Sequence, residues 1–192
     1  MAGRNDVRTR MVAAGEDLLS HRGYGVTMLD VIARAEAPRG SIYYHFPNGK
    51  PELALEVAAK VTAEIQALVA WADAKVADPV AFLQRLVDHH RKRLVTSGYT
   101  LGCPLMGITV TGDIEPGPLA DAIDGAFAAW LAAIAAALEG KGLPPAGAAR
   151  LASMTVTGVE GAIVLARARR SGKPFDELRA TVPALVASAR EG

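Results

Sequence analysis

The segment from residue 27 to residue 50, TMLDVIARAEAPRGSIYYHFPNGK, constrains the fold of this chain more than any other segment. Its pattern predicts two short helices that are joined by a tight turn at Ala35-Glu36-Ala37. Thr27, followed three residues later by Asp30, forms a cap pair that marks the start of the first helix. The spacing i, i+3, i+4 predicts an inward face on that helix, made of Leu29, Ile32 and Ala33.

The second helix of this segment carries two different faces. Pro38 suits its start, because the missing N–H costs nothing there. Ile42 and Phe46 are four residues apart and predict a buried face. The remaining side chains are expected to face solvent, and they are Arg39, Ser41, Tyr43, Tyr44 and His45. Hydroxyl, imidazole and guanidinium groups contact phosphates and base edges, and a helix-turn-helix places such a helix in the DNA major groove.

These residues resemble the N-terminal domain of TetR-family transcriptional regulators. The matching pieces are DVIARA, the run PRGSIYYHF, the following Lys50, and upstream AGEDLL with RGY. The resemblance implies a three-helix DNA-binding domain over residues 1–50, with Arg39, Ser41 and Tyr44 as candidates for base contacts. It also implies phosphate contacts from Thr27, Tyr43, His45 and Lys50, and Gly40 completes the set of expected DNA-binding residues. One departure is the stretch PNGKPEL, where two prolines and a glycine predict that the next helix begins near Pro51.

The remainder, residues 51–192, is expected to be a helical bundle for ligand binding and dimerisation. Abundant alanine and an aromatic content of only 5% favour helix over sheet, so the fold class is all-α, with about nine helices in the whole chain. The 51% hydrophobic content is ample for a buried core. Proline, glycine and cap signals predict helices at about 51 to the low seventies, 79–95, 104–112, 118–139, 145–170 and from 174 onward.

The predicted helix over residues 145–170 is apolar on most of its surface, so we expect it to pack on its own domain and on a second subunit. In the TetR family the last two helices pair across a twofold axis. Such pairing would hold two recognition helices about 34–36 Å apart, as successive major grooves require. The expected dimer interface consists of Leu151, Thr155, Gly158, Ala162, Leu178, Val182 and Leu185.

The middle of the chain resembles the LmrA/YxaF-like C-terminal domain in GCPL (102–105), Phe127 with Trp130, VEGA (159–162) and ARA (166–168). This resemblance implies a planar apolar effector of the multidrug or flavonoid type. The candidate effector-binding residues are His90, Met106, Phe127, Trp130 and Glu160. Each has an alternative interpretation: the first four as ordinary core, and Glu160 as an interface salt-bridge partner.

Several other classes of protein are disfavoured by the sequence. Cys103 with His89 and His90 lacks an identifiable oxyanion loop or orienting acid, and adjacent helical histidines point about 100° apart and cannot chelate from one face. We therefore expect no enzyme, no metal site and no cofactor. The start MAGRNDVRTR lacks the apolar core of a signal peptide, and the apolar stretch 126–138 is too short for a bilayer span. A single cysteine fits a reducing cytoplasm.

The sequence as a whole predicts a ligand-responsive transcriptional regulator, most simply a repressor, which binds a palindromic operator as a homodimer and is released by a small apolar or aromatic effector. Arg4, Arg8 and Arg10 form either a basic arm that reaches the DNA or a solvated tail. Two alternatives remain: an effector-independent architectural DNA-binding protein, and a small helical enzyme or carrier.

Overall fold

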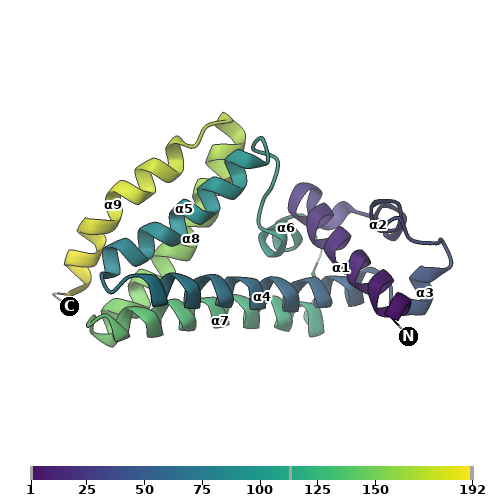
Figure 1. Ribbon diagram of the computed structural model, residues 1–192, viewed down its shortest axis with the longest axis horizontal. Helices are drawn as coiled ribbons and strands as arrows, with labels where there is room; N and C mark the ends of the chain where they lie inside the picture. Colours follow the sequence, from purple (N-terminus) through teal and green to yellow (C-terminus); the bar gives the residue numbers. More distant parts are fainter. Residues whose placement is uncertain (1, 113, 191–192) are drawn as a thin grey trace. The chain divides into compact units, whose positions relative to one another are not determined.

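The computed structural model describes residues 2–112 and 114–190, with side chains from residue 6 onward. The described chain is helical throughout and contains no strand, as the composition predicted (Figure 1). Its elements are α1 (Ala2–Arg22), the 3₁₀ helix η1 (Gly23–Gly25), α2 (Met28–Ala35), α3 (Ser41–His45), α4 (Lys50–Lys75), α5 (Pro79–Thr96), α6 (Pro104–Thr111), α7 (Pro118–Gly140), α8 (Pro145–Arg169) and α9 (Lys173–Arg190).

The chain divides into two compact units. Unit 1 consists of Met1–Val61 with Gly102–Ala126, and unit 2 consists of Thr62–Leu101 with Phe127–Gly192. Helices α4 and α7 each contribute residues to both units, and α6 belongs to unit 1. The expected boundary near residue 50, between the DNA-binding part and the ligand-binding part of the chain, stays a prediction.

In unit 1, α1 packs against α2, η1 and α6. Helix α2 begins with the expected capping box: the Thr27 side chain accepts a hydrogen bond from the Asp30 amide, and the Asp30 carboxylate accepts one from the Thr27 amide. The inward face is made of Val31, Ile32 and Ala35. The expectation for Leu29 and Ala33 was wrong, since both are exposed, Leu29 by 63%. Val31, Ile32 and Ala35 occupy one side of the helix, and Leu29 and Ala33 lie outside it.

Pro38 had suggested that the helix begins there, but α3 begins at Ser41. The Ser41 amide donates to the Pro38 carbonyl at 2.9 Å, so a tight turn precedes the helix. The chain leaves α2 through Glu36, whose φ of 49° lies in the left-handed region. The expected buried pair is confirmed, because Ile42 is 6% exposed and Phe46 is fully buried.

Unit 2 is built on α5, α8 and α9, which pack against one another and lie side by side in Figure 1. Asp78 caps α5 as expected, accepting from the Ala81 amide at 2.8 Å, and Pro79 follows in the first turn. The largest buried side chains of this unit are Phe82, Leu83, Leu138, Leu151 and Phe175. Apolar residues from five helices, α4, α5, α7, α8 and α9, meet in one core of this unit.

Four of the seven predicted dimer-interface residues offer little surface to a second chain. Leu151, Thr155, Ala162 and Val182 are buried within the protomer itself and present almost no surface to another chain. Gly158 allows a close approach, but the neighbour is Leu178 of the same chain: a Cβ at Gly158 would lie 2.8 Å from a Leu178 methyl carbon. Leu185 packs against the core of unit 2. Helix α9 packs against α8 in this unit, so burial counts against Leu151, Thr155, Ala162 and Val182 as interface residues, and the interface itself stays a prediction.

Candidate nucleic-acid interface and ligand-binding residues

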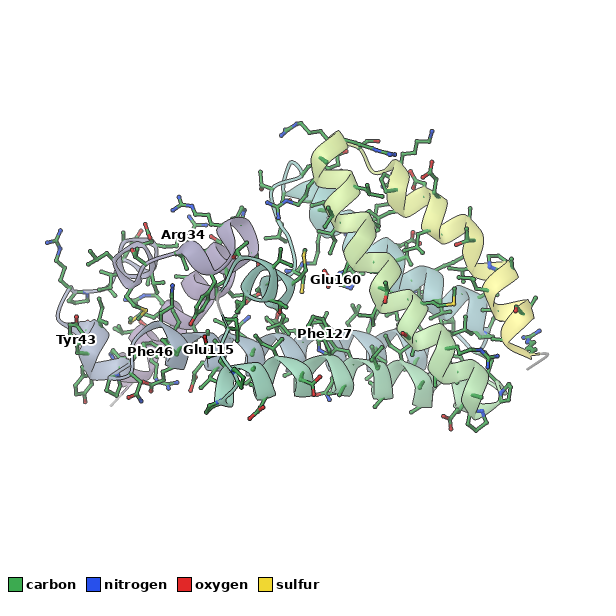
Figure 2. The ribbon with its side chains drawn as sticks, turned by 180° about the vertical axis from the view of Figure 1, so that it is seen from behind. Arg34, Tyr43, Phe46, Glu115, Phe127 and Glu160 are labelled. Atoms are coloured by element: carbon green, nitrogen blue, oxygen red, sulfur yellow. The ribbon has the colours of Figure 1, made fainter. Side chains whose placement is uncertain are left out.

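Helix α3 displays an unusual amount of aromatic surface. Tyr43 is 77% exposed and Tyr44 is 60% exposed. Figure 2 shows Tyr43 pointing away from unit 1, while Phe46 from the same segment lies inside it. The Tyr44 and His45 rings meet edge to face, with centroids 5.0 Å apart. Arg39 and Gly40 are exposed just before the helix, and Ser41 is half-buried at its first position.

Arg8 of α1 contacts both the residue that ends α3 and a carboxylate of α4. Its guanidinium lies 5.0 Å from the centroid of the buried Phe46 ring. The same group donates to both carboxylate oxygens of Glu56 on α4, at 2.5 and 2.7 Å. This bidentate pairing lowers the pKa of Glu56, mainly through the hydrogen bonds from Arg8. Lys60 and Glu16 form a second α4–α1 ion pair at 2.5 Å.

The proposed basic arm is instead part of helix α1. Arg8 is committed to Glu56, and Arg10 pairs with Asp6 and donates to the Ala35 carbonyl at the end of α2. Both guanidinium groups therefore stabilise unit 1. The side chain of Arg4 lies outside the described part of the chain.

Two of the predicted phosphate contacts already have partners inside unit 1. Lys50 donates to the Tyr24 carbonyl at 2.7 Å, and its ammonium lies 4.1 Å from the centroid of the Tyr24 ring. The Thr27 hydroxyl donates to the Asp30 carboxylate at 2.6 Å. Thr27 caps the start of α2, and Lys50 is the first residue of α4. Their contacts with DNA stay a prediction.

The candidate effector residues Phe127 and Trp130 form an aromatic pair in unit 2. Their rings meet edge to face with centroids 5.0 Å apart and planes at 76°. Trp130 is only 4% exposed, and its indole N–H has no hydrogen-bond partner among the described residues. An unmet buried donor costs free energy. An arriving acceptor group would recover that cost.

The other three candidates have different environments. Burial, together with the nearby charges of His89 and Arg93, lowers the pKa of His90 to about 3, so its imidazole is neutral at physiological pH. Glu160 is half-buried on α8. Met106, also half-buried, belongs to unit 1, whereas the other candidates belong to unit 2. Whether the five residues share one ligand stays a prediction.

Sequence reasoning missed an apolar surface on α8. Met154, Val164 and Leu165 are 48%, 51% and 47% exposed, and Gly161 between them is exposed with open space above it. These positions follow one stripe of the helix at spacings of three, four and seven. Because α8 is apolar nearly all round, periodicity alone could not separate this stripe from the buried one.

Helices α7 and α8 are long and apolar enough to cross a membrane by length and composition alone, with 22% and 39% of their most apolar windows buried in this fold. Core helices of water-soluble proteins meet the same criterion. Within the described ranges, no group of three or more His, Cys, Asp or Glu side chains is arranged to hold a metal ion.

Two family models match this chain. The model for bacterial regulatory proteins of the tetR family matches residues 11–57, which contain α2 and α3. The model for the C-terminal domain of LmrA/YxaF-like transcriptional regulators matches residues 79–181, which begin at α5 and end within α9.

The chain is also similar to proteins of comparable length that are named HTH-type transcriptional regulators. The chain is 31% identical over 175 residues to the HTH-type transcriptional regulator Rv0196 of Mycobacterium tuberculosis, a match that covers 88% of each chain. It is 24% identical over 182 residues to the HTH-type transcriptional regulator LmrA of Bacillus subtilis, covering 94% of this chain and 97% of that one.

The fold agrees with these relationships. A TetR transcriptional regulator from Chloroflexus aurantiacus superposes with a TM-score of 0.80 at 23% identity, covering 97% of both chains. The regulatory protein TetR from Rhodobacter sphaeroides gives a TM-score of 0.79 at 22% identity, covering 91% of this chain and 95% of that one. With its capped helix-turn-helix, its C-terminal helical domain and these relatives, the chain belongs to the TetR family of transcriptional regulators, which are DNA-binding proteins and not enzymes.

Proposed function

We propose that this regulator is a repressor that binds a palindromic operator as a homodimer in the cytoplasm and leaves it when a small apolar effector binds. The observation that carries the proposal is the pair of exposed tyrosines on α3, above the fully buried Phe46. Exposing two large aromatic rings on a five-residue helix serves no packing purpose, whereas DNA would cover them.

The proposed DNA contacts divide into two kinds. Arg39, Ser41 and Tyr44 are assigned to base edges, because the exposed start and outer face of a recognition helix reach the floor of the major groove. Thr27, Gly40, Tyr43, His45 and Lys50 are assigned to the sugar-phosphate backbone. For Lys50, the ammonium donates to Tyr24 with one of its three N–H groups, which leaves two for a phosphate.

The DNA assignment is tested by anisotropy titrations with duplexes from the DNA beside the coding sequence and with a scrambled duplex. Tyr43→Phe removes one hydroxyl and should weaken binding to both duplexes by about 1 kcal/mol. Arg39→Ala and Tyr44→Ala should reduce the preference for the operator over the scrambled duplex. Tyr99→Phe and Arg150→Ala, which lie in unit 2, are the matched controls.

Two outcomes would count against this assignment. Unchanged affinity in all three α3 variants would remove α3 from the interface. Equal affinity of the unmodified protein for every duplex would favour an architectural DNA-binding protein over an operator-specific regulator.

We propose that the dimer forms through the exposed stripe of α8 that contains Met154, Gly161, Val164 and Leu165. Exposed apolar surface of this kind is typical of subunit interfaces. The exposed glycine would let a second helix approach closely. The exposed alanines of α9 would extend the surface, and they are Ala180, Ala184 and Ala187.

The effector is proposed to contact Phe127 and Trp130, with His90 and Glu160 of the same unit as further contacts. The support is the buried Trp130 N–H without a partner, since ligand sites are mostly apolar with a few polar groups that fix orientation. An effector acts only by preferring one arrangement of the protein over another. Helix α4, which contributes residues to both units, is the proposed coupling element.

Trp130→Phe tests the effector site, because it keeps an aromatic ring and removes the N–H. It should weaken effector-dependent release of the operator while leaving affinity for DNA without effector unchanged, as measured by anisotropy with a panel of planar apolar compounds. Trp71→Phe is the matched control. If no compound in the panel releases the operator or raises the melting temperature of the unmodified protein, the effector-independent alternative is the better account.

A further inference from the structure

A hollow of about 510 Å³ lies in unit 2, between the end of α4, one face of α5, and α9. Trp71 and Val76 come from the end of α4 and the chain after it, and Arg179 comes from α9. Helix α5 supplies the rest of the lining, with Ala81, Gln84, Arg85, Asp88, His89 and Lys92. Hollows that hold small molecules typically measure about 300–1,000 Å³. This one shares no residue with the DNA interface or with the proposed effector contacts.

The charges of this hollow are unequal. Its single carboxylate, Asp88, is occupied by Arg179, whose guanidinium lies 3.1 Å from one carboxylate oxygen and donates to the other at 3.2 Å. Arg85 and Lys92 have no carboxylate partner among the described side chains. They are seven residues apart on α5 and so lie on the same side of that helix. The lining therefore carries two uncompensated positive charges.

Trp71 gives the hollow an aromatic wall. Almost half of its surface, 49%, is exposed, and the Arg85 guanidinium lies 5.6 Å from its ring centroid. In this cation–π contact the guanidinium lies over one face of the indole, so a ligand that packs on the exposed part of Trp71 meets a positive charge close by. His89 lies between Arg85 and Lys92 along α5. Burial, followed by the charges of Arg93 and Lys92, lowers the pKa of His89, so that the ring offers a neutral hydrogen-bonding group.

From this arrangement we infer that the hollow is a second small-molecule site, which takes an aromatic carboxylate. The ring of the ligand packs on Trp71 and its carboxylate accepts hydrogen bonds from Arg85 and Lys92. A guanidinium matches a carboxylate in geometry as well as in charge. Asp88 on the same wall disfavours a multiply charged phosphate, so a singly charged anion fits best. The inference does not depend on the proposed effector site.

Isothermal titration calorimetry with 2-naphthoate tests the inference, with 2-naphthamide as the uncharged ligand of the same shape. We expect saturable binding of 2-naphthoate at one site per chain, weaker binding at higher salt, and no binding of the amide. Arg85→Gln and Lys92→Gln should each weaken binding about tenfold, as expected for losing a hydrogen bond to a charged group. Lys75→Gln removes an exposed cation of α4 that lies outside the lining and should have no effect.

Fluorescence locates the bound ligand. The chain has two tryptophans, so in a Trp130→Phe background only Trp71 reports, and 2-naphthoate should change its emission. Trp71→Leu should weaken binding without loss of helical content, because the residue is half exposed. The inference is overturned if 2-naphthoate does not bind, if the amide binds as tightly, or if the double variant Arg85→Gln/Lys92→Gln binds undiminished. Binding that is lost only in Trp130→Phe would place the ligand at the proposed effector site instead.

Discussion

His90 should make the stability of this protein depend on pH. Its folded-state pKa of about 3 lies below the ordinary value of 6.5, so between these two values the unfolded chain binds a proton that the folded chain does not. Stability contributed by the neutral imidazole is therefore present above the unfolded-state pKa and is lost as the pH falls. The loss approaches about 1.4 kcal/mol for each pH unit within that window.

Urea unfolding at several pH values between about 7 and about 5 measures this slope. His90→Gln should flatten the dependence, because glutamine does not titrate. His89→Gln is the control: its pKa is lowered as well, but the residue is less deeply placed and should account for a smaller part of the slope. An unchanged acid slope in His90→Gln would contradict the assignment.

Glu36 is the other residue whose local chemistry predicts a measurable effect. It ends α2 in the left-handed region, at φ 49°, where an L side chain costs about 1–2 kcal/mol and glycine costs nothing sterically. The greater entropy of glycine in the unfolded chain offsets about 0.4–1 kcal/mol of that gain. Glu36→Gly should therefore raise the free energy of unfolding by about 0.5–1 kcal/mol.

Glu36→Ala is the matched comparison, since alanine keeps the Cβ and hence the strain. It should not stabilise the protein in denaturant unfolding. If alanine stabilised it as much as glycine, the gain would come from removing the negative charge and not from the backbone.

At the scale of the helix, the cap of α5 carries the clearest prediction. Asp78 accepts from the Ala81 amide at 2.8 Å, which satisfies one of the free N–H groups at the start of the helix. Asp78→Ala should lower the free energy of unfolding by about 1 kcal/mol. Asp78→Asn keeps an acceptor oxygen and should lose much less. Equal losses in both variants would show that the charge of Asp78, and not its hydrogen bond, stabilises the helix.

Both ends of α2 are set by local backbone chemistry. The capping box fixes the start of α2 at Met28, and the left-handed Glu36 ends it after Ala35. The buried residues Val31, Ile32 and Ala35 occupy one side of α2, and Leu29 lies outside it. This is why Leu29, which satisfied the periodicity, became an exposed residue instead of a core residue.

For the whole molecule, assembly is the property most open to test. Gly161 lies exposed in the middle of the α8 stripe, with open space above its Cα. Gly161→Glu should fit within the protomer but place an unpaired charge in the proposed interface, at a cost of several kcal/mol. The variant should elute as a monomer in size-exclusion light scattering. It should bind the operator weakly, since a monomer presents only one helix-turn-helix to the DNA.

Ala74→Glu, at an exposed position of α4, is the control for adding a carboxylate and should remain a dimer. Circular dichroism would show whether the Gly161 variant keeps its helical content. A helical Gly161→Glu protein that still forms dimers would place the interface on a different surface.

The sequence by itself determined the helical fold, the position of nearly every helix and the face of α3. These features depend on local chemistry that can be read from neighbouring residues: Thr27 with Asp30, Asp78 with Pro79, and the spacing of Ile42 and Phe46. The start of α3 was the exception. Pro38 is equally suited to a tight turn, and the turn is what forms.

Only the tertiary structure decided which face of α8 is buried and what Lys50, Arg8 and Arg10 bind. A helix that is apolar nearly all round has no periodic signal that selects one face, so the choice was made by the packing of α9, with Leu178 against Gly158. The hollow beside Trp71 likewise required three helices to meet. Caps and short spacings act within a few residues, whereas these contacts join residues from distant parts of the chain, and sequence patterns carry no record of which distant residues will meet.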